Sequence, residues 1–199
     1  MGGAGSDRLL DGAAADRPDG HAAVPAAAPE GSPGDGDAGP LSDGRLTLGV
    51  GLGSDRNGEL EPFGEIVDPR ERAARLDRGL EALSTFWGGE FEPRPVQRPR
   101  IPVWVAARWQ TRRRPLQRAA RWDGAFPIEL PGPDALAELV DEVRALRGGS
   151  KGHFDFVVEI APGERAKPWE EAGATWLLTG FDLQPQLAEV RAVIEAAPR

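Results

Sequence analysis

The sequence predicts an α/β fold in which a parallel β-sheet carries helices outside it. First, short apolar, β-prone runs alternate five times with segments of helical periodicity, as βαβ crossovers require. Second, the apolar runs end in turn-forming residues, as expected where buried parallel strands enter loops. The pattern suits either a barrel or an open doubly wound sheet. Five units are too few for a complete eight-stranded barrel, which takes about 250 residues.

The first unit combines a strand, a glycine-rich loop and a helix with clear boundary signals. Residues 46–50 read Leu-Thr-Leu-Gly-Val and predict a short strand that enters the loop 51–54. Asp68 is an N-cap acid, Pro69 stands at the first helical position, and Glu71 lies three residues after the cap. The apolar positions that follow at helical spacing are Leu76, Leu80, Leu83 and Trp87.

The remaining four units repeat this order. Their strands are predicted at residues 101–106, 124–128, 154–160 and 174–178. Their helices are predicted around residues 116–120, 133–146, 168–172 and 185–197. The second of these helices has the clearest apolar face, formed by Leu136, Leu139, Val140, Val143 and Leu146.

The 199 residues fall into two parts of different composition. Residues 1–44 hold eight acidic and two basic side chains, a net charge of −6, whereas the rest of the chain carries only −2 of the total −8. The first part has too few large apolar side chains to offset an ordering entropy of about 1–2 kcal/mol per residue. We therefore expect residues 1–43 to be a disordered leader and residues 44–199 to fold.

Composition also excludes several classes of protein. The chain has no Cys, so it has no disulfide framework and no thiolate metal site. No apolar run approaches the roughly 18 residues of a membrane span, and the amino end lacks the apolar stretch of a signal peptide, so we expect a cytoplasmic protein without membrane contact. The near-neutral folded part has no extended basic face, which argues against nucleic-acid binding. No His, Asp or Glu cluster has the spacing of metal ligands.

Ligands of parallel α/β folds bind in the loops after the carboxyl ends of the strands. The loop after the second predicted strand is the most suggestive, because four arginines lie in this strand-to-helix turn, where guanidinium and free N–H groups favour phosphate. They are Arg108, Arg112, Arg113 and Arg114. The alternative to phosphate binding is that these arginines form a solvated surface turn in an arginine-rich protein. Gly51 and Gly53 would let a ligand approach the backbone of the first loop closely.

Other polar and aromatic residues are weaker candidates. His21 lies in the leader and His153 at the amino end of the fourth strand, so both are expected to be solvated. Trp104 and Trp176 fall within strands and are expected to pack in the core. Asp55, Arg56 and Asn57 either line a pocket or form a hydrated loop, and we favour the loop.

Several separated motifs resemble the luciferase-like flavin-dependent oxidoreductase family, the bacterial luciferase-like monooxygenases. The motifs occur in order at residues 44–53, 63–65, 68–72, 102–106 and 118–124, and the resemblance covers residues 42–199. This region of the chain is similar to the second half of that family's barrel, from about the fourth strand to the eighth. The resemblance therefore implies a partial (β/α)8 TIM barrel of about five βα units.

The family uses a reduced flavin mononucleotide (FMN), or in some branches a deazaflavin coenzyme, to activate oxygen or to move a hydride on a small organic substrate. By resemblance, the loop after the second strand holds the flavin phosphate and the first glycine loop borders the flavin. Many members have a Gly-Gly-Ser-like turn where this chain has Ala107 and Arg108, which favours an arginine contact in place of a backbone cradle. The implied cofactor-binding positions are Gly51, Gly53, Ala106, Ala107, Arg108 and Arg112.

The resemblance leaves the family's first three strands without a counterpart. Nothing in residues 1–43 resembles them, and our hypothesis is that this leader is a truncated or out-of-frame reading of high-GC coding sequence that joins the true frame near Leu41. Sequencing the DNA upstream of that codon tests it. A partial barrel exposes unpaired strand edges and an apolar interior, so we expect self-association. The alternative function is a non-catalytic remnant or partner subunit that associates with another chain.

Overall fold

A computed structural model describes residues 42–55, 58–90, 92, 94–150, 152–182 and 184–196. The predictions for residues 1–41, for His21, and for Arg56 and Asn57 lie outside these ranges. The strands are β1 (Leu48–Val50), β2 (Val103–Arg108), β3 (Gly124–Ile128), β4 (Asp155–Ile160) and β5 (Trp176–Thr179). The helices are α2 (Pro69–Thr85), α3 (Arg113–Ala119), α4 (Pro133–Leu146), α5 (Ala166–Glu171) and α6 (Leu187–Ala196), with short turns η1 (Glu61–Phe63), η2 (Phe86–Glu90) and η3 (Trp109–Thr111).

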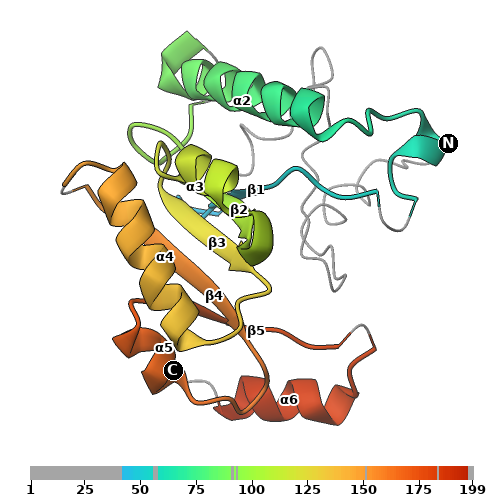
Figure 1. Ribbon diagram of the computed structural model, residues 1–199, viewed down its shortest axis with the longest axis vertical. Helices are drawn as coiled ribbons and strands as arrows, with labels where there is room; N and C mark the ends of the chain where they lie inside the picture. Colours follow the sequence, from blue (N-terminus) through green and yellow to red (C-terminus); the bar gives the residue numbers. More distant parts are fainter. Residues whose placement is uncertain are drawn as a thin grey trace, which may run out of the picture.

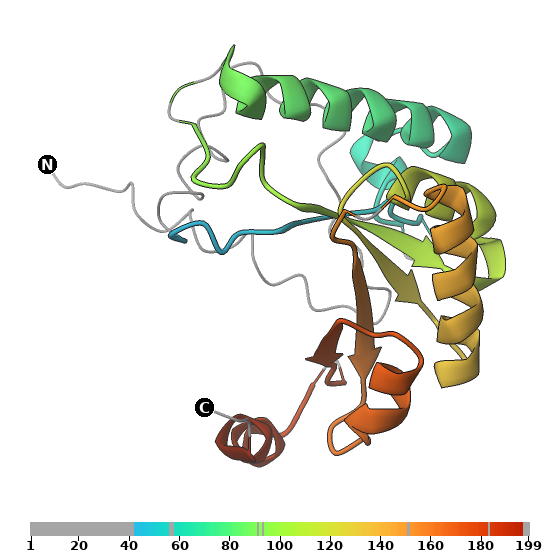
Figure 2. The same ribbon diagram turned by 90° about the vertical axis from the view of Figure 1, so that its left-hand side faces the viewer.

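The five strands form one parallel sheet in the order β1-β2-β3-β4-β5. Each strand pairs with the next one along the chain, so the order never reverses as it does in a doubly wound sheet. The sheet curls into half of a barrel wall (Figure 2). The predicted α/β class is confirmed, and of the two architectures that the strand pattern allowed, the partial barrel is the one observed.

Helices α3, α4 and α5 lie on one side of the curled sheet, its convex side (Figures 1 and 2). Alternate residues of β2 point to this side, and Val103, Val105 and Ala107 are buried in one cluster with Leu116 of α3 and Leu136 of α4. The intervening residues of each strand point to the concave side, which is the interior of a closed barrel. The hydrophobic core therefore lies between the sheet and these helices, and Leu76 and Leu80 of α2 belong to the same buried cluster.

Helices α2 and α6 lie at opposite ends of the molecule (Figures 1 and 2). The predicted cap of α2 is confirmed, because the side chain of Asp68 accepts a hydrogen bond from the Glu71 amide at 2.8 Å. In contrast, α6 buries no residue, and Leu187 and Ile194 are 65% and 67% exposed. No helix in the described ranges has the length and apolar character needed to cross a bilayer.

Two predictions from the sequence are wrong in detail. Strand β2 continues to Arg108, two residues beyond the predicted end, so Arg108 belongs to the strand and Arg113 and Arg114 belong to α3 instead of a turn. Trp176 is also not a core residue, because it points to the concave side and is 50% exposed.

Candidate functional site

The carboxyl ends of β1 and β2 meet closely on the concave side of the sheet. Val50 pairs with Val105, so Gly51 lies beside Ala106, and a Cβ atom added to Gly51 would lie 3.2 Å from the Ala106 side chain. Gly53 follows with a φ angle of 66°, a conformation that favours glycine. The small residues Gly51, Gly53 and Ala106 thus leave the backbone accessible at the carboxyl end of the half-barrel, which we call its mouth. Ala107 faces the other way and is fully buried against the helices.

Arg108 is the last residue of β2 and points to the concave side, at the level of Ile128 of β3. Its guanidinium forms an ion pair with Glu129, the residue that follows β3. Glu129 adopts a φ angle of 60°, which non-glycine residues rarely take and which turns the chain at the end of the strand. An arginine and a carboxylate therefore stand together at the mouth of the half-barrel.

Arg112 is held apart from Arg108. Its Nε donates a hydrogen bond of 3.1 Å to Glu142 of α4, and its guanidinium stacks on Trp109 with 3.7 Å between the guanidinium carbon and the ring centre. These contacts place Arg112 on the side of the sheet that the helices cover. The four arginines predicted as one cluster consequently separate: Arg108 lies at the mouth, Arg112 against α4, and Arg113 and Arg114 on α3.

A further arginine at this edge, Arg72 of α2, was missed by sequence reasoning. Its Nη1 donates a hydrogen bond of 3.1 Å to the carbonyl of Leu52, and a Cβ added to Gly53 would lie 3.9 Å from the same nitrogen. Its Nε is buried and has no hydrogen-bond partner in the described part of the chain. A buried donor without a partner is costly, and a ligand oxygen at this position would satisfy it. The only available sequence signal was its place in the motif 68–72.

A hydrogen-bonded aromatic cluster occupies the amino end of the concave side, the end opposite to the glycine loop. Asp155, at 7% exposure, accepts hydrogen bonds from Trp104 Nε1 at 3.0 Å and from Trp176 Nε1 at 3.1 Å. Thr175 and His153 also contact its carboxylate. His153 has a largely exposed side chain at the amino end of β4, as the sequence predicted. Catalytic residues of barrels lie at the carboxyl ends of the strands, so this cluster at the amino end has a structural role.

Asp55 lies in the loop after β1, where backbone amides fix its side chain. Its carboxylate accepts hydrogen bonds from the backbone amides of Leu60 and Glu61 at 2.6 and 3.2 Å, and so closes the turn before η1. Within the described ranges there is no group of three His, Asp or Glu residues that could hold a metal ion.

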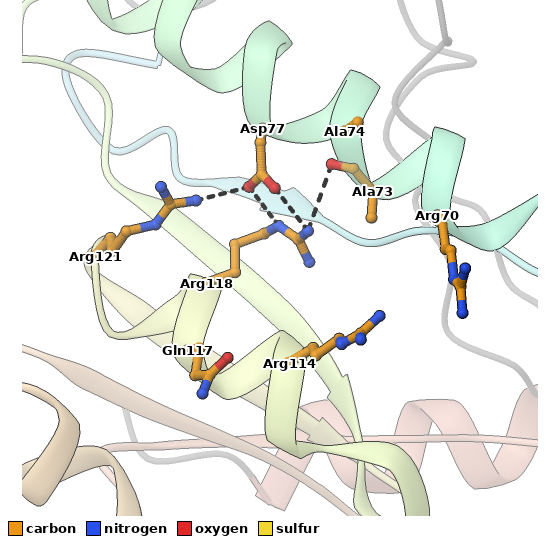
Figure 3. A pocket seen from close by; sticks show the side chains of 8 residues that line it. All are labelled: Arg70, Ala73, Ala74, Asp77, Arg114, Gln117, Arg118 and Arg121. Atoms are coloured by element: carbon orange, nitrogen blue, oxygen red, sulfur yellow. Dashed lines mark hydrogen bonds and ion pairs between the residues drawn. The ribbon is translucent and has the colours of Figure 1, made fainter.

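A separate groove of about 820 Å³ lies between α2 and α3 (Figure 3). Asp77 of α2 connects the two sides of this groove. Its carboxylate accepts two hydrogen bonds from Arg118, at 2.7 and 3.0 Å, and one of 2.7 Å from Arg121. The hydrogen bond from Arg118 is the main cause that lowers the pKa of Asp77 below its ordinary value, and the charges of both arginines add to it, against the opposing effect of burial. These ion pairs connect α2 to α3.

We expect Asp77→Asn to lower the free energy of unfolding by about 1–2 kcal/mol at pH 7, because Arg118 is 8% exposed and would lose its counterion. The folded-state pKa of Asp77 lies below the unfolded value. The stabilisation that the ionised Asp77 carboxylate gives the folded protein is therefore complete above about pH 5, and it is lost as the pH falls through the lowered pKa. Urea denaturation of both proteins from pH 7 to pH 3 measures it. A difference between them that does not shrink in acid contradicts this prediction.

The carboxyl edge of β1 and β2 brings together groups that can contact a phosphate-bearing ligand, although Arg108 is ion-paired with Glu129. Arg108 and Arg72 supply guanidinium donors, and Gly51 and Gly53 let a ligand approach the backbone. The Nε of Arg72, which has no partner in the described part of the chain, is a further donor at this edge. The residues present are thus compatible with the phosphate end of a flavin.

Comparison with known proteins gives the family of this chain. Residues 37–188 match the luciferase-like monooxygenase family. The chain is also similar to the oxygenase component of a flavin-dependent trigonelline monooxygenase from Acinetobacter baylyi, with 30% identity over 82 residues, 34% of this chain. That match covers 22% of the length of the relative. Because the family match spans most of the sequence, the chain belongs to the luciferase-like monooxygenase family.

Proposed function

We propose that this protein acts in a flavin-dependent oxidoreductase reaction of the monooxygenase type, with the flavin phosphate held at the carboxyl ends of β1 and β2. The observation that carries the proposal is the position of Arg108, which points to the concave side beside the contact of Gly51 with Ala106. Family membership and the similarity to a flavin-dependent oxygenase component support it.

Each residue at this edge has a distinct role in the proposal. Arg108 and Arg72 bind phosphate oxygens, while Gly51, Gly53 and Ala106 leave room for the flavin to approach the strands. Two positions implied by the resemblance act indirectly: Ala107 packs in the core, and Arg112 holds the turn after β2 against α4. The flavin, when bound, supplies the hydride transfer or the reduction of oxygen. FMN is the proposed form and a deazaflavin coenzyme the alternative. The substrate is a small organic molecule.

Arg108→Gln is expected to weaken FMN binding about tenfold or more and to leave riboflavin binding within twofold, because a charge-assisted contact to phosphate is lost while the ring contacts stay. Fluorescence titration of both flavins measures the two affinities. Arg113→Gln is the matched control, since it removes the same charge from an exposed position of α3. If Arg108→Gln weakens FMN and riboflavin equally, or no more than Arg113→Gln does, Arg108 does not bind the phosphate.

A second proposed function is a non-catalytic subunit that associates with another chain. It is favoured by apolar side chains that β5 and α6 leave exposed: Trp176, Leu178, Leu187 and Ile194. Sedimentation velocity over a range of concentrations, with and without FMN, separates the two proposals. Self-association without any flavin binding favours the subunit, whereas saturable flavin binding favours the enzyme.

A further inference from the structure

The groove between α2 and α3 has a strong excess of positive charge. Its polar lining consists of Arg70, Asp77, Arg114, Gln117, Arg118 and Arg121, so four guanidinium groups share one carboxylate. Figure 3 shows Arg70 extending from α2 and Arg114 from α3 into the space between the helices. The groove lies among helices outside the sheet, and none of its lining residues belongs to the carboxyl edge described above.

The single carboxylate in the groove is already engaged by two of the four arginines. Both oxygens of Asp77 already accept hydrogen bonds from Arg118, and one of them also accepts from Arg121. Arg118 is 8% exposed and also donates from Nη2 to the carbonyl of Ala73 at 3.4 Å. Its remaining nitrogen, Nη1, makes no hydrogen bond in the described part of the chain. Asp77 therefore fixes a nearly buried guanidinium that still has free donors.

Arg70 and Arg114 add two cations without counterions. Neither forms an ion pair or a side-chain hydrogen bond in the part of the chain that the structure describes. Arg114 also lies four residues before Arg118 on α3, and like charges at this spacing destabilise a helix by about 0.2–0.5 kcal/mol. Three guanidinium groups with free donors thus face one space of about 820 Å³, which exceeds the size of a single phosphate.

We propose that this groove is a binding site for a multivalent oxyanion, a diphosphate or longer phosphate chain, either free or as part of a larger molecule. Planar guanidinium groups pair with phosphate oxygens through parallel hydrogen bonds, so Arg70, Arg114 and Nη1 of Arg118 match successive phosphoryl groups. Gln117 lines the same groove with an uncharged amide. The proposal is independent of the proposed flavin site, since the two share no residue.

Isothermal titration with inorganic pyrophosphate at low ionic strength tests the site on the full chain. The variant Arg70→Gln/Arg114→Gln removes the two unpaired cations and keeps the ion pairs of Asp77 intact. The matched control is Arg78→Gln/Arg113→Gln, which removes the same charge from exposed positions of the same two helices outside the groove. We expect the first variant to lose about tenfold or more in affinity, and the control to stay within twofold of the unmodified protein.

Three results would overturn the proposal. The first is no heat of binding at about millimolar pyrophosphate, and the second is an equal loss of affinity in the variant and the control, which would indicate diffuse surface attraction. Binding of citrate as tight as that of pyrophosphate would also overturn it. A nucleoside diphosphate that binds more tightly than pyrophosphate identifies the phosphate chain as part of a larger ligand, whereas weaker binding identifies the free anion. Thermal unfolding of each variant checks that it is folded.

Discussion

Replacing Gly124 with alanine is expected to lower the free energy of unfolding by about 2–3 kcal/mol, because an added methyl group overpacks the concave side of the sheet. A Cβ atom at this position would lie 2.5 Å from Cδ1 of Trp104 and 2.9 Å from the backbone oxygen of Asp155. Gly124 pairs with Trp104 on one side and with Asp155 on the other. Because Gly124 has no side chain, the Trp104 indole of β2 can cross β3 at this point and reach Asp155 of β4.

Gly79→Ala is the matched control for this prediction. Gly79 lies in α2, and nothing stands within 4 Å of a Cβ added there. Since alanine favours a helix over glycine, this change is expected to stabilise the protein by about 0.5–1 kcal/mol. Urea denaturation at pH 7 measures both variants. If Gly124→Ala unfolds at the same urea concentration as the unmodified protein, the concave side has room for the methyl group and the packing argument fails.

Local signals were enough to predict the order of elements. The cap at Asp68, Pro69 at the start of α2, and the apolar face of α4 depend only on neighbouring residues, and each predicted helix is present. The parallel order of the strands follows from their alternation with helices. The choice between a barrel and an open sheet depends on the curvature and strand order of the sheet, which no local pattern contains. Only the resemblance to the family predicted the barrel.

The candidate site was harder to predict because its contacts join distant residues. Arg108 and Arg112 are four residues apart in the sequence, yet they lie on opposite sides of the sheet. Arg108 pairs with Glu129, which follows β3, and Arg112 pairs with Glu142 of α4. Arg72 reaches the loop after β1 from a helix 20 residues later. Side-chain direction at the end of a strand depends on its exact last residue, and element boundaries are the least certain part of a sequence-based prediction.

Asp155 shows the same limit for polar residues in the sheet. Acidic side chains are mostly exposed in folded proteins, and nothing local in the sequence marks Asp155 as an exception. Its position between Trp104 and Trp176, whose ring centres lie 5.5 Å apart, instead makes it the shared acceptor of two indoles from β2 and β5. The exposed indole of Trp176 is therefore fixed in place, although it is not a core residue.

We expect Asp155→Ala to lower the free energy of unfolding by about 2–3 kcal/mol. The carboxylate is 7% exposed, and its loss leaves the indoles of Trp104 and Trp176 without their acceptor. Partly buried donors that lose a charged acceptor cost more than the net value of an ordinary hydrogen bond. The stability of Asp155→Asn is expected to lie between that of the unmodified protein and that of Asp155→Ala. Its amide oxygen still accepts a hydrogen bond from one indole, while its NH₂ group faces the other donors.

His153→Gln separates the contribution of the two indoles from that of the histidine. The His153 ring lies 2.9 Å from the Asp155 carboxylate, but its side chain is 80% exposed, so its loss is expected to change stability by less than about 0.5 kcal/mol. Urea denaturation followed by tryptophan fluorescence measures all three variants. If Asp155→Ala costs no more than His153→Gln, the indoles find water as good an acceptor as the carboxylate. A larger cost for Asp155→Ala, with Asp155→Asn in between, shows that one buried carboxylate holds β2, β4 and β5 together at the amino end of the half-barrel.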